Sequence, residues 1–287
     1  MSFQRIWSWD DYYIPGTEVL RNKFVTEKEP YGVENPSRLD VLEDLYAEIR
    51  MRQLVDYPID ASFDYAHMKA IHYYIFQDVY EWAGQERTAP NVPMYKGTHA
   101  YYPAGPQLTA AAEEQYALIA AANYLRGMER PEFIAELAER WGEINIIHSF
   151  REGNTRSQCV FFSQLSQQAG YYFPPDAFKM GSPLREAFIN ARFHSQDTGS
   201  NAQLAHVLDQ VITPIQPART LVQEHLAQQP RTPKVTRDEV LKAIYRAQSS
   251  AGAPPSSMDP RRKLPYRGQR PYDQNGPNLG QGYKLGR

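Results

Sequence analysis

The sequence has a single cysteine, Cys159, among its 287 residues, so it cannot form an intrachain disulfide. It also has no run of about 18 apolar residues, which argues against a transmembrane helix. The first ten residues lack the apolar core of a secretory signal peptide. Together these absences predict a protein of the reducing cytoplasm, with translocation through a signal in the C-terminal tail left open.

The net charge of −2 conceals an uneven distribution of charge along the chain. Residues 1–214 carry 18 Lys and Arg against 28 Asp and Glu, a net charge of −10, whereas residues 215–287 carry 13 against 5, a net charge of +8. A basic tail on an acidic body suits an acidic partner, a nucleic acid or a membrane surface. We favour a solvated tail that maintains solubility, because charge runs are usually solvated.

Helical periodicity dominates after an N-terminal arm, residues 1–36, whose aromatic side chains are expected to pack on the body of the protein. Ser37 and Ser62 are the expected N-caps of the first two helices. The predicted helices cover residues 37–49, 62–84, 106–127, 131–147, 154–170, 182–195 and 200–212.

Two segments break the helical pattern. Residues 87–103 contain three prolines and a Lys-Gly turn between β-prone residues, which is typical of a short exposed hairpin. Residues 215–249 are a candidate helical extension. Residues 250–287 are rich in Pro, Gly, Arg and Gln, and they have too few aliphatic side chains to offset the entropy of ordering, so a disordered tail is expected.

The stretch from His148 to Arg156, His-Ser-Phe-Arg-Glu-Gly-Asn-Thr-Arg, lies between two predicted helices and suits phosphate chemistry. Gly153 permits a tight loop, and the helix starting near Asn154 offers free N–H groups and the positive end of its dipole to an anion. Arg156 can fork onto a phosphate, and Glu152 can offer an oxygen to Mg²⁺. His148 is placed as a general base.

This stretch resembles the signature of the Fic (filamentation induced by cAMP) family, His-x-Phe-x-Asp/Glu-Gly-Asn-Gly-Arg-x-x-Arg. The chain matches it at His148, Phe150, Glu152, Gly153, Asn154 and Arg156. Residues 12–23 and 80–88 resemble the arm and the segment leading to the flap in this family. The resemblance implies an all-α, Fic-type helical bundle over residues 37–214, with a small β-hairpin flap and, after it, the basic and largely disordered tail.

The resemblance further implies a protein adenylyltransferase, which moves AMP from ATP to a Ser, Thr or Tyr hydroxyl of a target protein, with Mg²⁺ as cofactor. His148 would be the base, and Glu152 would hold Mg²⁺ between the α- and β-phosphates. The backbone around Gly153 and the Asn154 side chain would bind the α-phosphate, with Arg156 on the β-phosphate.

Two further roles follow from the same resemblance. Phe150 is expected to point inward and anchor the loop. The flap would pair main chain to main chain with an extended segment of the target, as in β-augmentation. Its expected docking residues are Met94, Tyr95, Lys96, Gly97 and Thr98.

The chain departs from the signature at two positions. Thr155 replaces a Gly and either narrows the phosphate loop or adds a hydroxyl contact to it. Cys159 stands where the family carries a second Arg, which typically binds the γ-phosphate, and is expected to be a buried helix residue rather than a nucleophile. These departures leave open a different transferred group (UMP, GMP or phosphocholine) and a binding module without turnover.

Partners and regulation are less determined by the sequence. A protein substrate with an exposed hydroxyl is expected. No Ser/Thr-x-x-x-Glu-Gly/Asn string, the inhibitory signature of many Fic proteins, occurs outside the motif. Inhibition by a small antitoxin-like protein remains possible, and with it a role as a toxin or effector. Contact of the tail with nucleic acid is not favoured. His67 and His72 are expected to be structural helix residues rather than metal ligands.

Overall fold

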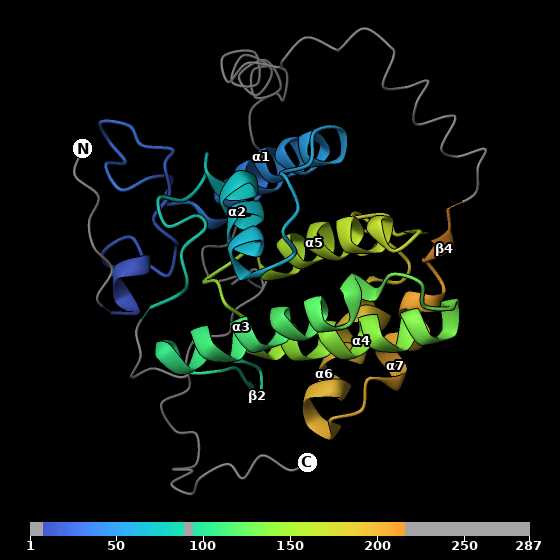
Figure 1. Cartoon of the computed structure of the whole chain (residues 1–287). Helices are drawn as coiled ribbons and strands as arrows, with labels where there is room; N and C mark the ends of the chain where they lie inside the picture. Colours follow the sequence, from blue (N-terminus) through green and yellow to red (C-terminus); the bar gives the residue numbers. More distant parts are fainter. Residues whose placement is uncertain (1–7, 89–93, 216–287) are drawn as a thin grey trace, which may run out of the picture. The chain divides into compact units, whose positions relative to one another are not determined.

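The computed structural model of the protein describes residues 8–88 and 94–215, which contain seven α-helices and two small two-stranded sheets (Figure 1). The helices are α1 (Pro36–Asp56), α2 (Tyr65–Phe76), α3 (Pro106–Ala121), α4 (Arg130–Ile147), α5 (Asn154–Gln168), α6 (Arg185–Thr198) and α7 (Ala202–Asp209). The expected all-α class is confirmed. No described helix is long and apolar enough to cross a membrane.

The N-caps of the first two helices differ from the prediction. Asn35 caps α1 and Asp64 caps α2, each accepting a hydrogen bond from the backbone N–H three residues later, at 3.0 and 2.8 Å. Pro36 follows Asn35 at the first helical position, where its missing N–H costs nothing. The assignments of Ser37 and Ser62 as caps were therefore wrong. Each lies within three residues of the side chain that caps the helix.

The short strands and turns connect these helices. Strands β1 (Tyr95–Lys96) and β2 (His99–Ala100) form the predicted hairpin between α2 and α3. Strands β3 (Tyr171–Tyr172) and β4 (Thr213–Pro214) form a second antiparallel sheet that the sequence did not predict. Single 3-10 turns, η1 (Asp10–Tyr12) and η2 (Asn123–Leu125), precede α1 and follow α3.

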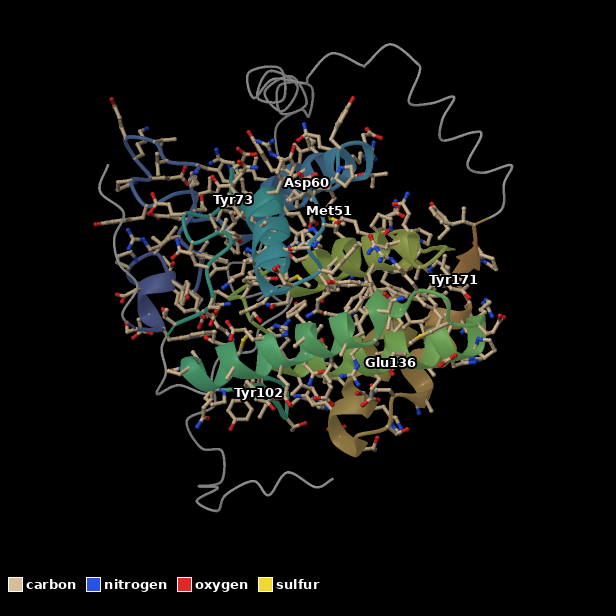
Figure 2. The ribbon with its side chains drawn as sticks, in the orientation of Figure 1. Met51, Asp60, Tyr73, Tyr102, Glu136 and Tyr171 are labelled. Carbon is tan, nitrogen blue, oxygen red and sulfur yellow. The ribbon has the colours of Figure 1, made fainter. Side chains whose placement is uncertain are left out.

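The core lies where α4 and α5 meet the helices around them. Trp141 of α4 is fully buried, stacks on Phe162 of α5 at 4.5 Å, and donates from its indole N–H to Gln158 at 3.1 Å. At the far end of α4, the Tyr171 ring labelled in Figure 2 stacks on Phe133 at 4.2 Å. This packing fixes α4 against α5 and thereby positions the loop that joins them.

The described residues up to Tyr95 and from His99 onward belong to one compact unit. The expected helical extension at residues 215–249 and the expected disordered tail at residues 250–287 lie outside the described residues, apart from Ile215.

Candidate active site

The six residues 148–153 join α4 to α5 and carry the motif found in the sequence. His148 ends α4 in the left-handed conformation, with φ 51° and ψ 60°. Gly153 precedes α5 with φ 81°. The short loop places an imidazole, a carboxylate and a helix N-terminus within a few residues of one another. The N–H groups in the first turn of that helix have no intrahelical acceptor.

His148 is held so that one ring nitrogen keeps a lone pair. Its Nδ1 lies 3.3 Å from the carbonyl oxygen of Asn145, which can only accept, so Nδ1 carries the proton. In the neutral ring, Nε2 is then the basic nitrogen. The side chain is 2 % exposed, and the Tyr101 ring lies against it at 4.1 Å. A hydroxyl would therefore reach His148 only after groups that cover the ring shift.

Asn154 braces the loop. Its side-chain oxygen accepts from the N–H of Phe150 at 2.9 Å, and its side-chain nitrogen donates to the carbonyl of Phe150 at 2.7 Å. Phe150 itself points inward, as predicted, and stacks on His72 at 3.8 Å. The side-chain NH₂ group has two N–H donors and uses one of them here, so the other could donate to a phosphate, and the expected phosphate contact of Asn154 stays a prediction.

Only glycine fits at position 153. Its φ of +81° is unfavourable for other residues, and an added Cβ would lie 2.2 Å from Cε2 of the Phe76 ring. Phe76 is fully buried at the end of α2 and has no room to retreat. The predicted conformational role of Gly153 is confirmed, and the close approach to α2 is an additional reason for the glycine.

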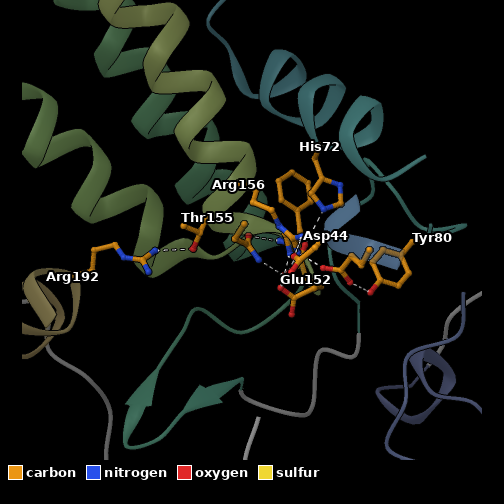
Figure 3. Close-up of polar contacts among 11 residues, drawn as sticks. Asp44, His72, Tyr80, Glu152, Thr155, Arg156 and Arg192 are labelled. Carbon is orange, nitrogen blue, oxygen red and sulfur yellow. Dashed lines mark hydrogen bonds and ion pairs between the residues drawn. The ribbon is translucent and has the colours of Figure 1, made fainter. Parts of the chain in front are cut away.

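Arg156 is engaged by carboxylates from α1 (Figure 3). It donates to Glu43, contacts Asp44 at 3.4 Å and Glu152 at 3.8 Å, and lies over the Phe76 ring at 4.7 Å. Burial lowers its pKa and the charge of Glu43 raises it, with a net increase. In this structure the partners of Arg156 are thus carboxylates of α1 and of the motif loop, and its expected role on the β-phosphate stays a prediction.

Glu43 was not identified from the sequence. It is 9 % exposed and accepts hydrogen bonds from Arg156 and from the Tyr80 hydroxyl. Burial raises the pKa of Glu43, while the Arg156 charge acts in the opposite direction. No local motif marks this residue, since its partners lie 37 and 113 positions away.

His72 was expected to be structural, and the structure gives it a defined role. Its Nδ1 accepts from the N–H of Gly84 at 2.8 Å, so its Nε2 carries the proton and donates to the carbonyl of Glu152 at 2.9 Å. The neutral ring thus ties the segment before the hairpin to the motif loop.

The stability of the fold should depend on pH through His72. Burial lowers the pKa of His72 from the ordinary value of 6.5 to about 3. Between these two pH values the unfolded chain binds a proton at His72 and the folded chain does not. The folded state then loses up to about 1.4 kcal/mol per pH unit as the pH falls. We expect His72→Gln to show a shallower fall of the unfolding free energy below about pH 6.5 in urea titrations.

A matched control separates this effect from a general loss of stability. His206 is exposed on α7, so His206→Gln should leave the pH dependence of the unfolding free energy as it is in the unaltered chain. Identical slopes for His72→Gln and the unaltered chain would contradict the assignment of the proton to His72.

Two buried arginines, one outside the loop and one within it, hold the loop in place. Arg87 donates to the carbonyls of His148 at 2.7 Å and Ile147 at 3.3 Å, and its N–H bonds to Ser149 at 2.8 Å. Arg151 lies over the Trp9 ring of the N-terminal arm at 4.4 Å. The aromatic arm thereby contacts the motif loop directly.

The two positions that depart from the family signature both face α6. Arg192 of α6 donates through Nη1 to the hydroxyl of Thr155 and to the side-chain oxygen of Asn145, each at 3.0 Å (Figure 3). Cys159 is buried, and burial raises the pKa of its thiol to about 12, a shift that the nearby Arg192 charge opposes. This agrees with the prediction that Cys159 is not a nucleophile.

The expected docking residues occupy the hairpin and its base. Met94 is buried, Tyr95 is exposed and lies with Lys96 in β1, and the turn consists of Gly97, with φ +63°, and Thr98. The β2 strand packs on α6, where His99 stacks on Phe193 at 4.1 Å. The docking role of these residues stays a prediction.

The residues fit a magnesium ion that is shared with a bound nucleotide. Among the described residues, no cluster of three or more His, Cys, Asp and Glu could hold a metal alone. Mg²⁺ in nucleotide sites is usually held by one or two carboxylates together with substrate phosphates. Glu152 supplies one carboxylate beside the α5 N-terminus, with its side chain 32 % exposed and Oε1 accepting from the N–H of Gly153 at 2.9 Å.

Comparisons with known proteins agree with this geometry. The model of the Fic/DOC family matches residues 62–166, which run from just before α2 to near the end of α5. The probable protein adenylyltransferase y4lH of Sinorhizobium fredii is 38% identical over 164 residues, covering 56% of this chain and 78% of the relative. The protein adenylyltransferase VbhT of Bartonella schoenbuchensis is 35% identical over 188 residues, covering 66% of this chain and 37% of the relative.

Solved structures show the same fold. The Bartonella tribocorum effector BepC, with bound AMPPNP, superposes with a TM-score of 0.63 at 22% identity and covers 72% of this chain and 98% of its own. The N-terminal Fic domain of a putative cell filamentation protein from Bartonella quintana, with bound ADP, gives a TM-score of 0.63 at 24% identity. The match covers 73% of this chain and 97% of that domain. These matches confirm the predicted Fic-type helical bundle.

Proposed function

The chain belongs to the Fic/DOC family, and from this premise we propose that it is a protein adenylyltransferase, which transfers AMP from ATP to a hydroxyl of a target protein. The relative that is 38% identical over most of its own length is named as a probable protein adenylyltransferase. The observation that carries the proposal is the imidazole of His148, with its basic Nε2, at the loop that opens into the N-terminus of α5.

In the proposed reaction, Nε2 of His148 takes the proton of the target hydroxyl. The hydroxyl oxygen then forms a bond to the α-phosphorus of ATP, and the bond from that phosphorus to the bridging oxygen breaks. AMP stays on the target as a phosphodiester, and pyrophosphate leaves. The N–H groups in the first turn of α5, with the positive end of the helix dipole, would stabilise the negative charge on the α-phosphate.

Magnesium is part of this proposal. Glu152 would hold Mg²⁺ together with the α- and β-phosphates, and a bound Mg²⁺ would neutralise phosphate charge. The hairpin of β1 and β2 supplies a strand edge to which an extended target segment would add main chain to main chain. Since His148 is 2 % exposed, groups that cover its ring would have to shift for the hydroxyl of the target to reach it.

The proposal is tested by incubating the purified chain and a cell lysate with ATP labelled at either the α- or the γ-phosphate. We expect the bands that appear only when the chain is added to carry the α-label alone, and to be lost when a chelator removes divalent ions. Bands that depend on the added chain and carry the γ-label would indicate a kinase reaction and contradict the proposal. Bound ATP without any labelled band would instead favour a binding module without turnover.

The same assay decides the donor. An excess of unlabelled ATP should abolish the labelling, whereas UTP, GTP or a phosphocholine carrier at the same concentration should leave most of it. Stronger competition by one of these would assign that group as the one transferred.

A further inference from the structure

Arg192 is a cation beside the proposed phosphate site. It makes no ion pair with a carboxylate among the described residues, and its Nε is shielded from solvent without a described hydrogen-bond acceptor. By contrast, Arg156 in the first turn of α5 already contacts three carboxylates. A partly buried guanidinium without a negative partner loses hydration, and a bound anion would offset that loss.

The guanidinium of Arg192 lies at the N-terminus of α5. Its Nη1 is held by Thr155 in the first turn of α5 and by Asn145 in the last turn of α4, both at 3.0 Å. Its guanidinium also lies over the Phe188 ring at 4.5 Å, which restricts its orientation. These contacts use Nη1, and Nε is shielded from solvent, so Nη2 is the nitrogen that would bind an oxyanion at the helix N-terminus, where phosphates are favoured.

Positions 155 and 159 lie one helical turn apart and therefore share a face of α5. The hydroxyl at 155 accepts a hydrogen bond from Arg192, and the thiol at 159 lies within the electrostatic influence of the same guanidinium. An arginine at 159 would place a second cation beside Arg192, and the two would repel each other. The small neutral Cys159 leaves this space to Arg192.

Building on the proposed function, we propose that Arg192 of α6 binds the phosphate chain of the nucleotide donor. Thr155 and Asn145 orient its guanidinium toward the first turn of α5. The two departures of the motif, Thr155 and Cys159, then belong to one arrangement, in which α6 rather than α5 supplies the phosphate-binding cation.

The test compares ATP binding by Arg192→Met, Arg192→Lys and the unaltered chain, using calorimetry with Mg²⁺ over a range of NaCl concentrations. The matched control is Arg140→Met, because Arg140 on α4 is equally shielded but pairs with Glu136 at 2.9 Å. Thermal unfolding without nucleotide is recorded for every variant, so that a loss of stability is seen separately from a loss of binding.

We expect Arg192→Met to weaken ATP binding roughly 10- to 100-fold, as is usual for losing a hydrogen-bonded charge. The salt dependence of its ATP affinity should be shallower than that of the unaltered chain, because one fewer cation meets the phosphates. Arg192→Lys should lose less affinity, and Arg140→Met should bind ATP as the unaltered chain does.

Unchanged ATP affinity in Arg192→Met would overturn this inference and leave the proposed function standing. So would a weakened affinity with an unchanged salt dependence, since that result would indicate a purely structural role. If the unaltered chain itself does not bind ATP, the proposed function fails, and this inference fails with it.

Discussion

Replacing His148 by alanine is expected to reduce transfer of the α-label to protein by roughly 10²- to 10⁴-fold, the usual contribution of a general base. The expectation follows from the tautomer of the ring, whose Nδ1 donates to the carbonyl of Asn145, so that Nε2 is the nitrogen that would accept the proton of the hydroxyl. The measurement is the initial rate of labelling of the target band. Calorimetry on the same variant should show ATP affinity close to that of the unaltered chain, because the ring touches the hydroxyl rather than the phosphates.

The control for this variant is His206→Ala, which removes an exposed imidazole on α7 and should leave the labelling rate unchanged. Labelling by His148→Ala at the rate of the unaltered chain would remove His148 from the role of base. An equal loss of ATP binding and labelling would instead assign it to holding the nucleotide.

The second large effect is expected for Gly153→Ala. The new Cβ would overlap the buried Phe76 ring at 2.2 Å, and the φ of +81° adds the strain of a left-handed residue. Overpacking typically costs about 1–3 kcal/mol and the left-handed backbone about 1–2 kcal/mol, so we expect a loss of about 2–5 kcal/mol in the free energy of unfolding. Labelling should fall as well, because the loop must shift away from α2.

Gly181→Ala is the matched control, because Gly181 has nearly the same φ, +80°, but no atom within 4 Å of an added Cβ. It should lose only the backbone part, about 1–2 kcal/mol. Denaturant titration of both variants measures the difference. Equal losses would show that the contact with Phe76 adds nothing, and that the glycine is required for its backbone alone.

The parts of the site that the sequence predicted are local. His148, Gly153 and the start of α5 were found because a helix end, a glycine and a helix start follow one another within a few residues. The inward anchor at Phe150 follows from the same short segment, although its partner His72 does not. The all-α class was predictable because helical periodicity extends over most of the described chain.

The parts that the sequence did not predict depend on distant partners. The pairing of Arg156 with Glu43 joins residues 113 positions apart, and that of Arg192 with Thr155 joins residues 37 positions apart. Periodicity shows which residues face inward but not which charged side chains meet across two helices. The strands at 171–172 and 213–214 are two residues long, too short to leave an alternating pattern.

The proposed reaction requires the loop between α4 and α5 to bind the phosphates of a nucleotide next to the basic nitrogen of His148. A crystal structure of the chain with Mg²⁺ and a non-hydrolysable ATP analogue tests it most directly. We predict phosphate oxygens bonded to the N–H groups in the first turn of α5 and to the guanidinium of Arg192, with the α-phosphate facing His148. Phosphates bound elsewhere, or an empty loop at saturating nucleotide, would contradict the account.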